Sequence, residues 1–546
     1  MYEHTRRRVL AGLAAAAGLT LVSACASGAN GGQSGHSARP ATEQNIPSFT
    51  YAITQMPTSL NSMSTKVNTQ MITSLVTEPM ERVAFEQGTV KITPHLAASV
   101  TEPDQSTVVY KLREGVKFSD GKPLTAEDVA WSFTASAAPT AETAGNMAGL
   151  KSAKVTGPDE VTVTWKYPLV GLRIALAAVQ VQEAAFAEAH AKELGTSAAL
   201  PIGTGPYAYQ GQTSQDITLA RNPAYWGTRP KPDAVKFTVI SDNSAAQLAM
   251  RSGSLQAGEV TDLKTASQWK NSGASLYPAD DFNSNLLSMD TSTPPFDDVQ
   301  VRKAVAHAID VKGVLAAAFG EYAKPLGTLV PTGVLAGVAP SPAEAQAFVD
   351  QLPRYEFDLA KAKAELARSA HAGGFDVTVP YMNTDPWQKL LLLNLQQNMK
   401  QLGVTVTPKP VPPGQWFQTF FSHQTSGIQV IPGFTSTLPD PSGLMFSFVG
   451  KANMKANFIN AANFTTDTVE KNYRALAPES AATYDKEARW AATRAVLTEV
   501  AEQVPYVPLF TRQNVYTMAG GLTYLRPPSF YDKVSGTWID LVRSSK

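Results

Sequence analysis

The sequence is poor in cysteine and has no excess of charge of either sign. Cys25 is the only cysteine among 546 residues, so the chain can form neither an internal disulfide nor a zinc site built from several cysteines. Its 46 basic and 46 acidic residues cancel, which argues against nucleic-acid binding through a basic face. The rest of the composition, with 43% hydrophobic and 17% charged residues, is typical of a globular chain. The length predicts about three domains of ordinary size.

Long apolar runs are missing beyond the N-terminal region. In the rest of the chain, the densest apolar patch runs from Leu390 to Leu393, far short of the ~18 residues that a membrane helix needs. We therefore expect a soluble body that reaches the membrane only through Cys25, in its N-terminal region.

Short motifs of common catalytic sites are missing as well. The sequence contains no H-E-x-x-H, no G-x-S-x-G and no phosphate loop ending in GK[ST]. Its histidines are scattered without the spacing of metal ligands: His4, His36, His95, His190, His307, His371 and His423. An active site assembled from distant residues is compatible with these absences, but nothing favours one. We expect no catalytic residues, no metal and no cofactor.

The N-terminus has the pattern of an exported lipoprotein. Arg6 to Arg8 form a basic region, Val9 to Val22 are apolar, and small residues lead to Cys25. The string LVSAC resembles a bacterial lipobox, in which cleavage before the cysteine exposes a thiol that carries lipid. We expect residues 1–24 to be a signal peptide and Cys25 to be lipidated. An ordinary signal peptide with an incidental cysteine is the alternative. Thr5 to Leu10 also fit a twin-arginine pattern, so twin-arginine and general secretory export both stay open.

Residues 25–48 follow as a predicted flexible tether, because Ala26 to Asn45 are rich in glycine, serine, alanine and asparagine without periodicity. Ordered structure is expected to begin with a strand near Phe49 to Ile53, followed by a helix near Thr69 to Met80. Ala175 to Leu194 are rich in alanine and predict a further helix.

The stretch from Val109 to Phe133 predicts a hairpin, a turn and a capped helix. Val109 to Leu112 and Val116 to Phe118 read as short strands, and Asp120-Gly121 is a strong turn signal. Thr125 is placed as a helix N-cap, with acidic residues in the first turn near the positive end of the helix dipole.

The ordered string LR-x-GVKF-x-DG-x-P-x-TAEDV-x-WSF in this stretch resembles the signature of the family 5 solute-binding proteins, the peptide- and nickel-type receptors of ABC importers. Further motifs of that family follow in order over about residues 49–530. They include Gly203 to Tyr207 (GTGPY), Arg221 to Trp226, and Val301 to Val305 after the acids Asp297 and Asp298. GTGPY lacks the GK[ST] ending and the following helix of a nucleotide-binding loop, so nucleotide binding is rejected.

The resemblance implies an α/β fold, the two-lobed periplasmic-binding-protein-like clamshell of type II with the extra domain of the peptide-binding class. The expected domain I comprises 49–80, 201–277 and 505–546, domain II comprises 81–200, and domain III comprises 278–504. Chain crossings near Pro278 to Phe282 and near Val504 to Pro508 would form the hinge. Between them, Val377 to Tyr381, a helix from Asp385 to Leu402, and Val404 to Thr407 predict a βαβ unit with parallel strands.

The function implied by the resemblance is that of an extracytoplasmic lipoprotein, anchored to the outer face of the cell membrane. It would capture a peptide or peptide-like solute between its lobes and deliver it to the permease subunits of an ABC importer. We expect a monomer that does not bind nucleic acid. The alternatives are an import-inactive clamshell with a structural or regulatory role, a binder of a neutral solute such as an oligosaccharide, and, least favoured, a hydrolase.

The ligand-binding residues implied by the resemblance are Asn61, Trp416, Phe434, Thr437 and Asp440. Peptide-binding members carry GW-x-x-D-x-x-DP, whose first aspartate pairs with the ligand's ammonium; here Thr437 takes that place. Asp440 is a displaced anchor or a structural turn residue, and Trp416 belongs either to the cleft or to the core. A hydroxyl cannot neutralise an ammonium, and an uncompensated buried charge costs about 3–5 kcal/mol. We therefore expect weak binding of free dipeptides and preference for longer, blocked or neutral ligands.

Overall fold

The computed structural model describes residues 40–86, 89–169, 171–423, 427–435, 441–456, 458–476 and 485–545. The chain divides into two units, 1–37 and 38–546, and all the described residues belong to the second. Among them, no helix combines the length and apolar character needed to cross a membrane.

A ten-stranded sheet is the centre of this unit. Its strands, in order across the sheet, are β11 (Tyr207–Gln212), β12 (Asp216–Arg221), β13 (Ala234–Val239), β2 (Phe49–Ile53), β14 (Ala257–Glu259), β21 (Tyr506–Met518), β16 (Asn283–Met289) and β20 (Ile428–Thr435), with β15 (Ser275–Asp280) and β17 (Ala323–Pro325) also paired with β21.

Three neighbouring strands of this sheet are parallel. β2 lies between β13 and β14, and both run parallel to it, so the carboxyl ends of all three meet at one edge. The chain reaches β14 from β13 through the helix α5 (Asn243–Arg251). A helical connection of this kind is what joins parallel strands. The predicted first strand at 49–53 is confirmed.

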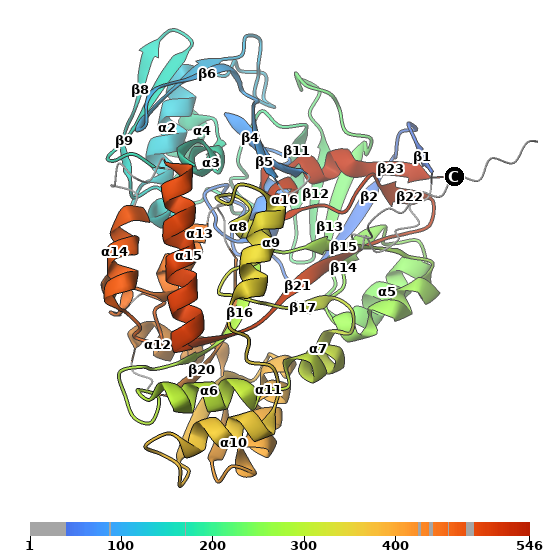
Figure 1. Ribbon diagram of the computed structural model, residues 1–546. Coiled ribbons are helices and arrows are strands. Elements are labelled where there is room, and N and C mark those ends of the chain that lie inside the picture. Colours follow the sequence, from blue (N-terminus) through green and yellow to red (C-terminus); the bar gives the residue numbers. More distant parts are fainter. Residues whose placement is uncertain are drawn as a thin grey trace, which may run out of the picture. The chain divides into compact units, whose positions relative to one another are not determined.

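One long strand joins the two halves of the sheet. The first part of β21 pairs with β16, where Pro508 lies opposite Leu286. The rest of the strand, from Gln513 opposite Asp280 onward, pairs with β15. The chain therefore crosses between the halves twice, side by side, at 280–283 and at 510–513; β21 can be followed across the centre of Figure 1. The sequence placed the second crossing at 504–508. It lies later because the first residues of β21 are still paired with β16.

The family signature forms part of a four-stranded antiparallel sheet and its covering helix. The sheet order is β6 (Ala97–Asp104), β7 (Thr107–Leu112), β9 (Glu160–Trp165) and β8 (Leu150–Gly157). α2 (Ala126–Ser136) packs on this sheet, and Thr125 and Asp128 form its capping box, which confirms the predicted N-cap. Residues 116–118 form no strand; Lys117 makes only an isolated bridge to Pro123.

Two predicted helices are shorter than expected. The first, α1 (Val67–Thr73), stops early because the following residues Glu78–Pro79 form β3, which pairs with β10 (Gln180–Val181). That same pairing divides the second predicted helix into α3 (Leu172–Ala177) and α4 (Ala184–Ala189). Local periodicity could not show either break, since the pairing joins segments about a hundred residues apart.

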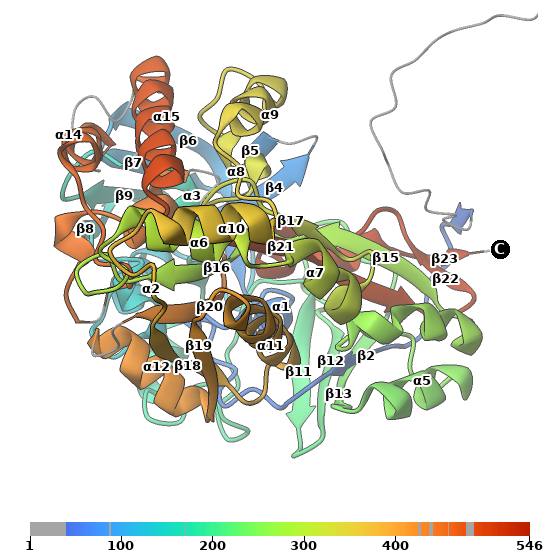
Figure 2. The ribbon, with the colours of Figure 1, turned by 60° about the horizontal axis from the view of Figure 1, so that its bottom comes forward.

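Residues 278–504 add a βαβ unit and most of the helices. β18 (Asp376–Met382), α11 (Pro386–Lys400) and β19 (Thr405–Val411) have the predicted parallel arrangement, and Figure 2 shows α11 beside the two strands. Asp298 caps α6 (Val299–His307), its side chain accepting a hydrogen bond from the Gln300 N–H. The other helices of this part are α7 (Val311–Phe319), α8 (Thr332–Leu335), α9 (Pro342–Gln351), α10 (Leu359–Ala367), α12 (Pro413–Ser422), α13 (Pro441–Met445), α14 (Asp467–Leu476) and α15 (Lys486–Gln503).

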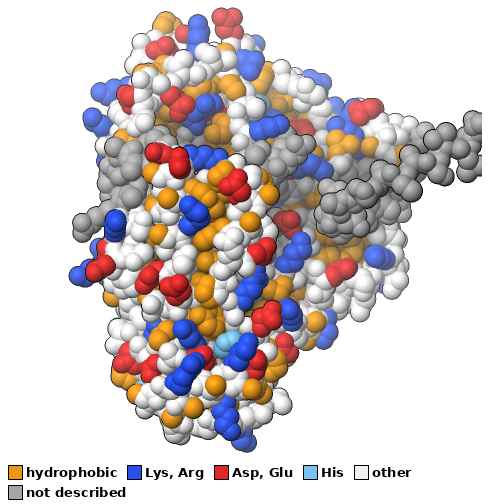
Figure 3. Space-filling model, viewed as in Figure 1, with side chains coloured by type: hydrophobic (Ala, Val, Ile, Leu, Met, Phe, Trp, Pro, Cys, Tyr) orange, Lys and Arg blue, Asp and Glu red, His pale blue; other side chains and the backbone are white. Residues whose placement is uncertain are grey.

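Short elements complete the described chain. They are the strand pair β4 (Glu81–Glu86) and β5 (Thr89–Pro94), the three-stranded sheet β1 (Ala41–Thr42), β23 (Val542–Ser545) and β22 (Leu522–Tyr524), and the helix α16 (Phe530–Ser535). On the face seen in Figure 3, basic and acidic side chains are interspersed, in keeping with the balanced composition.

Candidate ligand-binding site

A pocket of about 400 Å³ lies at the carboxyl ends of the three parallel strands. Residues that end or follow these strands, such as Thr54, Ser241 and Thr261, contribute to its wall. The first residues of α1 and α5 form further parts of the wall. The carboxyl edge of parallel strands is where open α/β sheets commonly bind ligands, because the connecting chains diverge there and leave a crevice. We call this cavity the hinge pocket, since residues of both crossings also line it.

The hinge pocket contains a buried cation from the C-terminal region. Lys533 of α16 is 6% exposed; its Nζ lies 3.5 Å from a Glu259 carboxylate oxygen and 5.0 Å from the centre of the Tyr516 ring. Burial alone would lower the pKa of Lys533, but the Glu259 charge and the Tyr516 hydroxyl raise it. The ammonium therefore stays charged, and it is already compensated within the protein.

Two further charged residues of the wall, Asp281 and Arg512, come from the crossings. Asp281 accepts a hydrogen bond from Asn283 Nδ2 at 2.9 Å, and Arg512 is exposed. The positive charge of Arg512 also reaches Asp385, next to α11, where it partly offsets the rise in the pKa of that carboxyl caused by burial. Arg512 therefore stands where the two halves of the sheet meet.

Aromatic and aliphatic side chains fill the rest of the wall, among them Tyr51, Met71, Trp269 and Phe530. The pocket combines apolar surface with a few charged groups, which suits a small ligand that has both polar and apolar parts. Because two crossing segments belong to the wall, any rotation of one half of the sheet against the other would change the pocket.

The described site residues predicted from the sequence lie away from the hinge pocket. Asn61 is in a loop held against the segment 180–195, where its Oδ1 accepts from Gln182 Nε2 at 3.3 Å. Trp416 is 2% exposed and stacks on Phe420 with ring centres 4.9 Å apart. Phe434 lies 6.0 Å from Phe420, in the same aromatic cluster. The ligand-binding roles of all three stay predictions.

Three of the residues predicted from the sequence cannot be placed in the structure. Cys25, Thr437 and Asp440 lie outside the described residues.

The sequence patterns did not identify four charged residues of the hinge pocket: Glu259, Asp281, Arg512 and Lys533. The predicted strand at 49–53 could have pointed to the wall at Thr54, by the rule that ligands bind beyond the carboxyl ends of parallel strands. No local signal joins Arg512 or Lys533 to these strand ends, because they come from the last forty residues of the chain.

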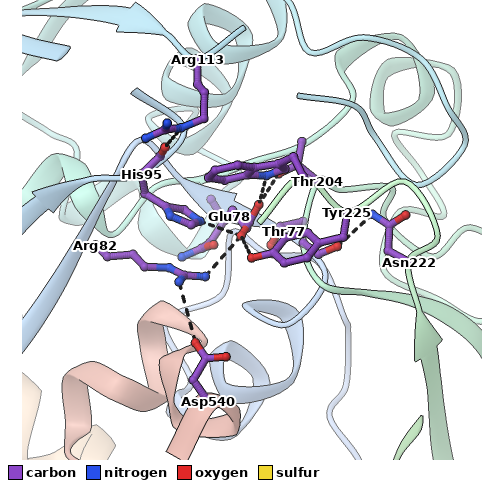
Figure 4. Close-up of polar contacts among 12 residues, drawn as sticks. Thr77, Glu78, Arg82, His95, Arg113, Thr204, Asn222, Tyr225 and Asp540 are labelled. Carbon is purple, nitrogen blue, oxygen red and sulfur yellow. Dashed lines mark hydrogen bonds and ion pairs between the residues drawn. The ribbon is translucent and has the colours of Figure 1, made fainter. Parts of the chain in front are cut away.

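A second polar cluster, which we call the Glu78 hub, lies in the part of the chain that carries the family motifs (Figure 4). Glu78 of β3 is fully buried. Five donors surround its carboxylate: His95 Nε2 at 2.6 Å, Thr204 Oγ1 at 2.9 Å, Trp226 Nε1 at 3.0 Å, Arg82 Nη2 at 3.2 Å and the Tyr225 hydroxyl at 3.2 Å. Burial alone would raise the pKa of Glu78, but His95, Arg82 and the Trp226 indole hold it below its ordinary value.

The hub explains three of the recognised motifs. Thr204 comes from GTGPY, Tyr225 and Trp226 come from Arg221 to Trp226, and Arg113 of the signature donates from Nε to the His95 carbonyl at 3.0 Å. The glycines of GTGPY are needed for close packing, since a Cβ on Gly203 would lie 2.1 Å from the Val76 carbonyl oxygen. These motifs therefore build a structural junction, and GTGPY packs backbone against backbone.

Within the described residues, no group of three or more histidine, cysteine, aspartate or glutamate side chains could hold a metal ion.

Comparison with known proteins identifies the family. Residues 91–456 match the bacterial extracellular solute-binding proteins, family 5, in their middle region. The glutathione-binding protein GsiB of Shigella boydii is 24% identical over 446 residues, covering 80% of this chain and 83% of that protein. These proteins are named for solute binding, in agreement with the prediction that the chain is not an enzyme.

Solved structures show the same fold. The ABC transporter substrate-binding protein CtaP of Listeria monocytogenes has a TM-score of 0.77 at 20% identity, over 92% of this chain and 100% of that one. DppA of Helicobacter pylori, solved with the peptide STSA, has a TM-score of 0.72 at 20% identity, over 92% of this chain and 99% of that one. The predicted two-lobed α/β fold is thereby confirmed. The chain belongs to family 5 of the bacterial extracellular solute-binding proteins.

Proposed function

We propose that this protein is the substrate-binding component of an ABC importer and carries a peptide or peptide-like solute. The observation that carries the proposal is a family 5 fold with a mixed polar and apolar pocket beside its two chain crossings. A relative named for glutathione binding and a structural neighbour solved with a tetrapeptide support the ligand class.

The geometry suggests how capture would work. A ligand in the hinge pocket would contact residues of β2, β13 and β14 on one side and the crossing residues Asp281 and Arg512 on the other. If it also touches the second half of the sheet, it binds the closed form better than the open one and shifts the population toward closure. Delivery to the permease would then follow from recognition of the closed form.

The solute itself can be tested directly. We expect mass spectrometry of the gently purified protein to show a bound peptide or peptide-like molecule. With that ligand at saturation, small-angle scattering should give a smaller radius of gyration than without it. A saturated protein with an unchanged radius would contradict closure and favour an import-inactive clamshell. A neutral sugar as the bound molecule would favour the oligosaccharide alternative, which the threonine at position 437 also supports.

Membrane attachment through Cys25 is part of the proposal. It is supported by the position of this only cysteine, directly after the apolar N-terminal run. Mature lipoproteins carry more than one acyl chain, which is the condition for stable anchoring. We expect Cys25→Ala to leave the body folded but to release it from the detergent phase in phase partitioning. Unchanged membrane retention of the variant would contradict lipidation at this residue.

A further inference from the structure

A second cavity, of about 470 Å³, lies next to the Glu78 hub and shares no wall residue with the hinge pocket. We call it the basic pocket. Five cationic side chains line it, namely Arg82, Arg113, Arg229, Lys231 and Arg543, against the two carboxylates Glu43 and Asp540. This local excess of positive charge stands out in a chain whose total charge is zero.

Glu43 forms ion pairs with two of the five cations. Its carboxylate lies 2.7 Å from Lys231 Nζ and 3.4 Å from Arg543 Nε. Arg82 is held between Glu78 at 3.2 Å and Asp540 at 3.9 Å (Figure 4). Its Nε is buried and has no acceptor among the described residues. An unsatisfied buried donor is costly, so this wall has capacity for a further acceptor.

Arg113 and Arg229 have no carboxylate partner among the described residues. The guanidinium of Arg113 lies 5.0 Å from the centre of the Trp226 ring, and its Nε donates to the His95 carbonyl. Arg229 is exposed and donates to the Pro223 carbonyl at 3.2 Å. Each retains free N–H groups, in the planar fork that binds phosphate oxygens in pairs. Trp226 and Tyr225, whose ring centres are 5.9 Å apart, give the pocket an aromatic wall beside these forks.

We propose that the basic pocket binds the phosphate group of an organic phosphate ester, held by Arg113 and Arg229. Its volume exceeds that of a bare phosphate ion and leaves room for an attached organic part beside Trp226. The phosphate could belong to a soluble ester or to the headgroup of a membrane lipid. Glu43, one of the residues lining the pocket, lies eighteen residues after Cys25 in the sequence. The lipid source therefore rests on the proposed anchoring, whereas the phosphate site does not.

The test is calorimetric titration of the mature protein, purified in nonionic detergent. The probes are inorganic phosphate, sn-glycerol 1-phosphate, and detergent micelles with or without phosphatidylglycerol. Binding of the glycerol phosphate would show that the ligand is a soluble phosphate ester. Binding only to the phosphatidylglycerol micelles would show that it is a lipid headgroup. Arg229→Gln should weaken either binding at least tenfold, and Arg113→Gln should do the same. Arg229→Gln is the decisive variant, because this exposed side chain makes only one hydrogen bond in the described structure and the protein should fold normally.

The matched control is Arg251→Gln, which removes an exposed arginine outside both pockets and should leave binding unchanged. No saturable heat with any of the probes would overturn the proposal. Equal binding by wild type and Arg229→Gln would overturn it too, as would binding of inorganic phosphate alone. None of these three results bears on the proposed import function, which concerns the hinge pocket.

Discussion

The Glu78 hub and the hinge pocket both place charged side chains where distant segments meet, but they use those charges differently. The Glu78 carboxylate is fully buried and contacts five donors, from β4, from His95 directly after β5, and from the segments around 204 and 225. Arg512 of the hinge pocket is exposed, and the carboxylate of Asp281 accepts a hydrogen bond from Asn283. A saturated network fixes the segments that make it, whereas groups with spare hydrogen-bonding capacity can bind something that arrives later. Stability is therefore expected to depend on the first region and affinity on the second.

The strongest test of this contrast is Glu78→Ala. It leaves the Arg82 charge and four other donors without their common acceptor, and removal of one partner from a buried ionic network costs about 3–5 kcal/mol. We expect a loss of this size in the free energy of unfolding, measured by urea denaturation with tryptophan fluorescence, which reports on Trp226 among others. Ligand affinity of the folded variant should change little, because the hub does not line the hinge pocket.

Glu188→Ala is the matched control, since Glu188 is an exposed glutamate of α4. It should change the free energy of unfolding by no more than about 0.5 kcal/mol. A loss below about 1 kcal/mol for Glu78→Ala would contradict the structural role of the hub.

The pH dependence of stability gives a second, somewhat smaller effect. Because the pKa of Glu78 is held below its ordinary value of 4.5, its charge stabilises the folded state above about pH 4.5, and this contribution is lost as the pH falls below that value. Wild type should therefore exceed Glu78→Gln in unfolding free energy by about 1.5–3 kcal/mol at pH 7, the range for hydrogen bonds to a charged group. The difference should shrink in denaturation series run from pH 5 to pH 3. A difference that is constant with pH would show that the carboxylate charge is not what stabilises the hub.

Local sequence patterns predicted the regular elements that depend on neighbouring residues. The Thr125 cap, the first strand at 49–53 and the parallel unit of β18, α11 and β19 follow from capping, alternation and spacing. The hub was missed because Glu78 fell within a stretch whose apolar periodicity predicted a helix. Its strand exists only because Glu78–Pro79 pairs with Gln180–Val181, a contact that no local pattern contains. The motifs nevertheless identified the family, since their residues converge on that junction.

The hinge pocket was only partly predictable, for a related reason. Part of its wall lies at the end of the predicted strand 49–53, but two of its charged residues, Arg512 at the second crossing and Lys533 of α16, come from near the C-terminus. The aromatic residues chosen from the sequence, Trp416 and Phe434, instead pack together with Phe420 in the part of the chain between the crossings. Aromatic bulk alone does not distinguish a core from a ligand wall.

On the hinge-pocket side of the contrast, Arg512→Ala should change affinity and leave stability alone. Loss of a charged hydrogen bond to a ligand costs about 1.5–3 kcal/mol, which corresponds to roughly ten- to a hundredfold in Kd. The free energy of unfolding should stay within about 0.5 kcal/mol of wild type, because the side chain is exposed. Calorimetry with the ligand recovered from the purified protein measures the first quantity, and urea denaturation measures the second. A variant that is destabilised but binds normally would reverse the roles assigned to the two regions.

The smallest expected effect concerns the charge at the ligand's amino end. The resemblance implies that Thr437 takes the place of the anchoring aspartate of peptide-binding members. In the hinge pocket, Glu259 is already paired with Lys533, and the Asp281 carboxylate accepts a hydrogen bond from Asn283. If no other acid takes over that role, N-acetylation of a peptide should not weaken its binding, and free dipeptides should bind more weakly than longer or blocked peptides. Calorimetry with a dipeptide, its N-acetyl form and a tetrapeptide compares these directly. Submicromolar binding of the free dipeptide that collapses on acetylation would refute the expectation. Asp281→Asn then locates the acid responsible: it should abolish that preference if Asp281 is the anchor, and leave it intact if the acid is Asp440.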